Sequence, residues 1–112
     1  MYAHPMNPDL LRGHLDGLLL AVLTEGPGHG YELSRRLRDR SGGELAVPEG
    51  SLYPALHRLE RGGLVESSWS TEGARRRRVY RTTAAGRRAV ADSREEWRTF
   101  AAAVHQVMGM SA

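Results

Sequence analysis

The chain has 112 residues, of which 40% are hydrophobic and 26% charged, and this length suits one small domain or one domain with an appended helix. It contains no cysteine, which excludes a disulfide scaffold, a thiol nucleophile and a zinc site built on thiolates. The net charge of +3 is uneven, because residues 51–88 hold nine arginines and three acids, so this segment either contacts a polyanion or is a solvated surface.

No segment of the sequence has the pattern of a membrane span. The longest apolar run, residues 18–23, is far shorter than the roughly 20 residues that cross a bilayer. The first nine residues lack the positive and apolar regions of a signal peptide. We therefore expect a cytoplasmic protein.

A first helix is expected to begin at Asn7 and Pro8, which suit a helix cap and a first turn. It should end at Gly26-Pro27-Gly28, where glycine allows a left-handed cap and proline cannot continue the helix. Leucines and valines recur between these ends on more than one helical face. Such a helix must be buried on several sides.

A second helix is predicted over about residues 30–40, with Tyr31 or Leu33 and then Leu37 directed inward. A pair of glycines ends it. We expect residues 44–47 to form a short strand, because the valine that precedes a proline favours the β region.

A third helix is predicted over residues 49–62, with Pro54 in about its first turn, where no hydrogen-bonded N–H is lost. At about 100° per residue, one arc of this helix is entirely apolar, with Leu52, Ala55, Leu56 and Leu59. The opposite arc carries small and basic residues, namely Gly50, Ser51, Pro54, His57, Arg58 and Arg61. We expect the first arc to enter the core and the second to face outward.

The apolar period then shortens to about 2 residues. Residues 65–70 and 77–82 should form a hairpin around a turn at 71–74, and Trp69 is expected to pack this hairpin onto the body. Thr83 can cap a last helix that runs to about residue 108. At about 1.5 Å per residue this helix is roughly 37 Å long, so it should project from a small domain and meet a partner.

The element order predicts a mainly α fold with a small β wing. It comprises a winged helix-turn-helix domain over residues 8–83 and one long dimerisation helix over residues 84–109. In this arrangement the third helix enters the major groove of DNA and the hairpin touches the adjacent backbone. His57 and Arg58 can donate hydrogen bonds to base edges or phosphates. The hairpin tip carries four consecutive arginines that can contact phosphates, namely Arg75, Arg76, Arg77 and Arg78. Alternate members of this run point to opposite faces of the hairpin.

The sequence contains a set of characteristic segments, namely Gly30-Tyr31-Glu32-Leu33, the stretch Gly50-Ser51-Leu52-Tyr53-Pro54-Ala55-Leu56-His57-Arg58-Leu59-Glu60, Trp69, and Arg77-Arg78-Val79-Tyr80-Arg81-Thr82-Thr83-Ala84-Ala85-Gly86. Together these segments resemble the PadR family of transcriptional regulators. The resemblance implies a dimeric repressor that reads an inverted repeat in double-stranded DNA and is released by a small molecule. It also implies a DNA-facing role for the matching residues Tyr31, Ser51, Tyr53, Pro54, His57 and Arg58, together with the wing arginines. Tyr31 and Tyr53 have an alternative place partly inside the core.

An apolar stripe runs along the last helix with heptad spacing, at Val90, Ser93, Trp97, Phe100, Val104 and Val107. With Leu11 and Leu15 of the first helix, this stripe predicts a two-fold dimer interface. Trp97 and Phe100 are candidates for an effector pocket that takes a flat aromatic or drug-like ligand, the alternative being plain interface packing.

The sequence offers little support for an enzyme. The five histidines include no pair at helical ligand spacing, so we expect no metal site, and no cofactor motif is present. The glycine-rich segment 26–30 lacks the lysine of a phosphate-binding loop and is interpreted as a turn. The alternative to a DNA-binding regulator is a winged helix that binds only another protein.

Overall fold

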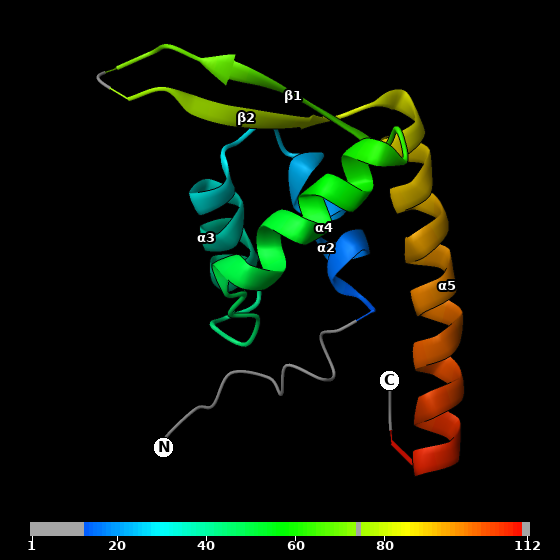
Figure 1. Ribbon diagram of the computed structural model, residues 1–112. Coiled ribbons are helices and arrows are strands. Elements are labelled where there is room, and N and C mark those ends of the chain that lie inside the picture. The colour runs from blue at the N-terminus through cyan, green and yellow to red at the C-terminus, as the bar shows by residue number, and fades with distance from the viewer. Residues whose placement is uncertain (1–12, 74, 111–112) are drawn as a thin grey trace.

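The computed structural model describes residues 13–73 and 75–110, which form four helices and a two-stranded antiparallel sheet (Figure 1). The elements, in chain order, are α2 (Leu15–Leu23), α3 (Gly30–Arg40), α4 (Glu49–Arg61), β1 (Val65–Ser70), β2 (Arg77–Thr82) and α5 (Ala84–Met108). This arrangement confirms the predicted winged helix with a long C-terminal helix. The predicted start of the first helix, at Asn7 and Pro8, lies outside the described residues.

The core surrounds α2, which lies between α3, α4 and α5. Leu19, Leu20 and Leu23 of α2 are each at most 3% exposed, which confirms that this helix is buried on several sides. Leu33 and Leu37 pack from α3, and the apolar arc of α4 packs from the other side. Each fully buried leucine contributes about 1.5–3 kcal/mol relative to an exposed one.

The predicted short strand at residues 44–47 is wrong, because this segment has no strand pairing. The free edge of β2 pairs with Gly28, in the turn before α3. The backbone N–H of Gly28 donates to the Tyr80 carbonyl at 3.0 Å, and that of Tyr80 donates to the Gly28 carbonyl at 2.9 Å. With β1 on its other side, β2 has no edge left at this point for a further strand.

The predicted position of Pro54 is also wrong by about a turn. Helix α4 begins at Glu49, so Pro54 is its sixth residue and lies past the first turn. Because proline has no N–H, the helix lacks the bond that would reach the carbonyl of Gly50.

Helix α5 is joined tightly to the body at its beginning and leaves it towards its end (Figure 1). Thr83 caps the helix, as predicted, by accepting the N–H of Gly86 at 3.1 Å, and it donates to the Gly63 carbonyl at 2.7 Å. A β-carbon on Gly86 would lie only 2.2 Å from the Leu64 carbonyl oxygen, so this junction requires glycine. No helix among residues 13–73 and 75–110 is long and apolar enough to cross a membrane.

Candidate nucleic-acid interface

Helix α4 has a solvent-exposed face, which we call its open face, and on each side of this face one side chain contacts a neighbouring helix. Its apolar arc is at most 3% exposed, as predicted, whereas Ser51, Pro54, His57 and Arg61 on the opposite arc are exposed. At about 100° per residue, Tyr53 and Arg58 fall on the two borders between these arcs. Together with Pro54, His57 and Arg61 they line a shallow hollow of about 390 Å³.

Tyr53 is held against the first turn of α3. A β-carbon on Gly30 would lie 2.5 Å from the Tyr53 hydroxyl oxygen, so the ring can take this place only because residue 30 is glycine. Tyr53 is 39% exposed and keeps one side open to solvent. Tyr31 is 64% exposed, which settles the choice between the two inward candidates of α3 in favour of Leu33.

Arg58 is held at the other border by an acid that the sequence reasoning did not single out. Its Nη2 lies 2.9 Å from Oδ1 of Asp16 in α2, and its Nε lies 3.4 Å from Oδ2 of the same carboxylate. The hydrogen bond to Asp16, followed by the charge of that carboxylate, raises the pKa of Arg58 above its ordinary value. Arg58 therefore points towards α2 in the free protein.

The wing carries a stack of one aromatic ring and two guanidinium groups. Trp69 is 51% exposed, so the expectation that it packs the hairpin onto the body is wrong. The guanidinium carbons of Arg76 and Arg78 lie 4.5 and 5.2 Å from the centre of its ring. Arg78 also donates from Nε to Oγ of Ser67 at 3.0 Å. The stack holds two cations on one face of the hairpin.

Arg77 points to the other face, as strand alternation predicts. Its Nη1 lies 2.7 Å from Nε2 of His29, a second residue that the sequence reasoning missed. His29 caps α3 through a reciprocal pair of bonds with Glu32. One wing arginine is thus tied to the start of the helix-turn-helix, while Arg75 at the tip is exposed.

The residues predicted for the dimer interface divide into two groups. Leu15 and Val90 are 6% and 2% exposed and pack within the chain's own core, so they form no exposed seam. Trp97, Phe100 and Val107 are 46%, 59% and 86% exposed, and Val104 is half-buried. Leu11 lies outside the described residues.

The two predicted effector residues adjoin a small open cavity. It measures about 290 Å³ and is lined by His14, Glu96, Trp97 and Phe100. The rings of Trp97 and Phe100 meet edge to face at 5.9 Å, and the His14 ring lies 4.9 Å from that of Trp97.

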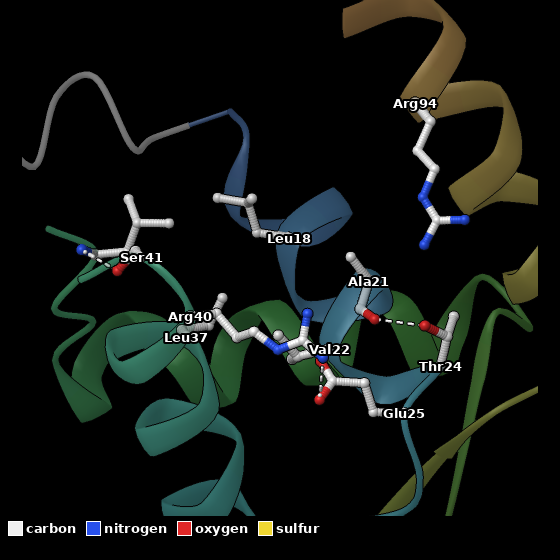
Figure 2. A pocket seen from close by; sticks show the side chains of 10 residues that line it. Leu18, Ala21, Val22, Thr24, Glu25, Leu37, Arg40, Ser41 and Arg94 are labelled. Carbon is white, nitrogen blue, oxygen red and sulfur yellow. Dashed lines mark hydrogen bonds and ion pairs between the residues drawn. The ribbon is translucent and has the colours of Figure 1, made fainter. Parts of the chain in front are cut away.

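A second groove, of about 420 Å³, lies where α2 faces α3 (Figure 2). Leu18, Ala21 and Leu37 contribute apolar walls, and Arg94 reaches towards it from α5. An ion pair of 2.7 Å between Arg40 and Glu25 borders this groove. Its lining combines apolar side chains with charges of both signs.

Three packed helices, an outward-facing third helix and an arginine-rich hairpin define a winged helix-turn-helix protein of the DNA-binding class. A family model described as the transcriptional regulator PadR-like family matches residues 19–92. The chain belongs to this family. It is a transcriptional regulator that acts on DNA, and not an enzyme.

Relatives and solved structures support the same assignment. The chain is 47% identical over 66 residues to the transcriptional regulator Rv3488 of Mycobacterium tuberculosis, covering 59% of each chain. A transcriptional regulator from Clostridium thermocellum is 33% identical, with a TM-score of 0.81 over 88% of this chain and 96% of that one. A PadR family regulator from Clostridium difficile is 31% identical, with a TM-score of 0.76 over 86% of this chain and 99% of that one.

Proposed function

We propose that the protein is a homodimeric repressor that binds an inverted-repeat operator and is released by a small aromatic ligand. The observation that carries this proposal is the open face of α4, bordered by Tyr53 and Arg58, beside a wing with exposed arginines. In this proposal residues 8–83 bind DNA and residues 84–109 hold the dimer together.

Each part of the DNA-facing surface has its own task in this proposal. Ser51 and Pro54 are small enough to let α4 approach the base edges, which His57 can then reach with a ring nitrogen. Arg76 and Arg78, stacked on Trp69, offer charge to the phosphate backbone beside the groove.

A gel shift with the promoter upstream of the protein's own gene tests DNA binding. The affinity should fall steeply with salt, because phosphate contacts release counterions. Replacing His57 with alanine should cost about 1–3 kcal/mol and relax the sequence preference if this residue reads a base. The absence of any shift at about 0.1 M salt would refute DNA binding and favour a winged helix that binds only protein.

The free part of α5 supports the dimer. Trp97, Phe100 and Val107 lie on one side of the helix at heptad spacing and are exposed. An isologous contact of two such stripes covers both at once, and it can set two copies of α4 one DNA turn, about 34 Å, apart.

The dimer is tested by sedimentation of the wild type and of a Phe100→Asp variant. A charge in the stripe should shift the protein to monomer, whereas Ala102→Asp, on the opposite side of the same helix and also exposed, should leave the dimer intact. A wild-type protein that stays monomeric at micromolar concentration contradicts the proposal.

The aromatic cavity supports the choice of ligand. Trp97, Phe100 and His14 present ring faces and edges that suit a flat apolar molecule, and Glu96 adds one charge at the rim. The chain has two tryptophans, so a Trp69→Phe variant leaves Trp97 as the only one. Phenolic acids and aromatic drugs should change its fluorescence. An unchanged signal across this panel would mean that Trp97 serves interface packing alone.

A further inference from the structure

Arg58 and Arg61 both lie along the open face of α4, but their contacts within the chain differ. Arg61 makes no ion pair or side-chain hydrogen bond with the rest of the described chain. Arg58 gives both its Nε and its Nη2 to the two carboxylate oxygens of Asp16. This is the parallel two-bond geometry in which a guanidinium group also binds a phosphate.

The pair between Arg58 and Asp16 is open to solvent on both sides. The side chain of Arg58 is 50% exposed and that of Asp16 is 41% exposed. Exposed ion pairs of this kind contribute little to folding, so Arg58 can leave Asp16 without disturbing the core. Its position at the border of the open face lets the same guanidinium group reach either α2 or a DNA backbone laid against α4.

We propose that the carboxylate of Asp16 binds Arg58 in the way that a DNA phosphate would, and thereby limits how tightly the protein binds DNA. This inference rests on the proposed DNA binding through α4. In the free protein the carboxylate holds the guanidinium group that DNA would use. On binding, the backbone must displace a bonded anion, and that anion remains beside the DNA and repels it.

The consequence is a particular response to the loss of Asp16. An Asp16→Asn variant keeps the size of the side chain and removes its charge, so Arg58 becomes free to contact a phosphate. One additional phosphate contact steepens the slope of log K against log salt by about 0.9. At about 0.1 M salt this corresponds to roughly eightfold tighter binding.

The experiment measures the affinity for a mixed-sequence duplex of about 30 base pairs, three turns of B-DNA, over a range of salt. Such a duplex reports backbone contacts and needs no knowledge of the operator. Asp39→Asn is the matched control, because it removes the same charge from an exposed acid of α3 whose carboxylate forms no ion pair or hydrogen bond within the described residues. The control should change the affinity much less than Asp16→Asn does.

A double-mutant cycle identifies Arg58 as the residue that responds. Arg58→Gln should weaken binding more in the Asp16→Asn background than in the wild type, and the double variant should lose the gained affinity and the steeper slope. Circular dichroism of all four proteins checks that they are folded.

The possible outcomes separate this inference from the proposed function. If Asp16→Asn binds DNA no better than the wild type, or no better than Asp39→Asn, Asp16 does not compete with DNA. If Asp16→Asn binds more weakly, Asp16 instead positions Arg58 for DNA, and the proposal is equally overturned. A wild-type protein that binds no duplex at all contradicts the DNA-binding function itself.

Discussion

Replacing Gly86 with alanine should strongly destabilise the protein at the junction of the wing and α5. The added β-carbon would lie 2.2 Å from the Leu64 carbonyl oxygen and 2.3 Å from Oγ1 of Thr82. The Leu64 carbonyl cannot easily move, because it accepts the backbone N–H of Thr83 at 3.1 Å. Relieving the overlap therefore means shifting the start of α5 away from β1.

The size of the effect follows from the contacts that this shift disturbs. Overpacking costs about 1–3 kcal/mol, and the loss of the Thr83 cap adds about 1 kcal/mol. The better helix propensity of alanine returns at most about 1 kcal/mol. The resulting net loss of about 1–4 kcal/mol is a large part of a typical unfolding free energy of about 5–15 kcal/mol.

Urea unfolding followed by circular dichroism, at a fixed protein concentration, measures this loss. With a slope of about 1.5 kcal/mol per molar urea, the midpoint should fall by about 0.7–2.7 M. Gly50→Ala is the control, because a β-carbon there meets no atom within 4 Å, and its midpoint should stay or rise slightly. An unchanged midpoint for Gly86→Ala would show that the close approach to Leu64 is not a constraint.

Three further predictions concern single side chains. Gly30→Ala should leave the fold intact but displace the Tyr53 ring, weakening DNA binding about fivefold, or 1 kcal/mol, in a gel shift; equal affinity contradicts the role of this contact. Arg36→Ala should lose about 1.5–3 kcal/mol in urea unfolding, because Arg36 donates to the carbonyls of Gly26 and Pro27 at 2.7 and 2.9 Å; an unchanged midpoint contradicts this. Burial raises the pKa of Tyr80, so the folded state keeps its phenol proton longer than the unfolded state does, and the stability it contributes is lost as pH rises above about 10. In a Tyr80→Phe variant, the free energy of unfolding should therefore fall less steeply with pH above about 10 than in the wild type. The same pH dependence in both proteins would show that Tyr80 is not its source.

The sequence predicted those elements whose signals are local. Helix α4 and the hairpin were placed correctly because the apolar period changes from about 3.6 to 2 near Leu64, between glycines and a turn. Residues 44–47 have a similar local preference for extended backbone. They follow the end of α3 that is remote from the hairpin, so no strand of the described residues lies beside them, and Val47 packs into the core instead (Figure 1). Local propensity could not reveal where this segment would lie in the fold.

Trp69 shows a similar limit for a single side chain. Strand alternation correctly put it on the same face as Val65, which is buried. It could not show that the hairpin extends beyond the core, so that the same face is exposed to solvent at residue 69. There the partner strand supplies Arg78, the residue paired with Trp69, in place of core side chains.

The contacts that hold the proposed DNA-facing residues join positions far apart in the sequence. Arg58 and Asp16 are separated by 42 positions, and Arg77 and His29 by 48. No spacing rule connects such pairs, since each depends on how whole helices cross. The sequence could therefore nominate Arg58 and Arg77 for DNA binding, but it could not show that each already has a partner in the free protein.

The start of α2 contacts both the aromatic cavity and the border of the open face of α4, through residues that lie within one helical turn of each other. The ring of His14 lies 4.9 Å from that of Trp97 in the aromatic cavity, and Asp16, two residues later, holds Arg58 at the border of the open face of α4. A ligand that enters this cavity and displaces the backbone at His14 also displaces Asp16, because the two residues share a turn. Such a displacement changes the distance between the carboxylate of Asp16 and Arg58. We therefore expect ligands of Trp97 to alter the affinity for DNA less in an Asp16→Asn variant than in the wild type, and gel shifts with and without ligand measure the difference.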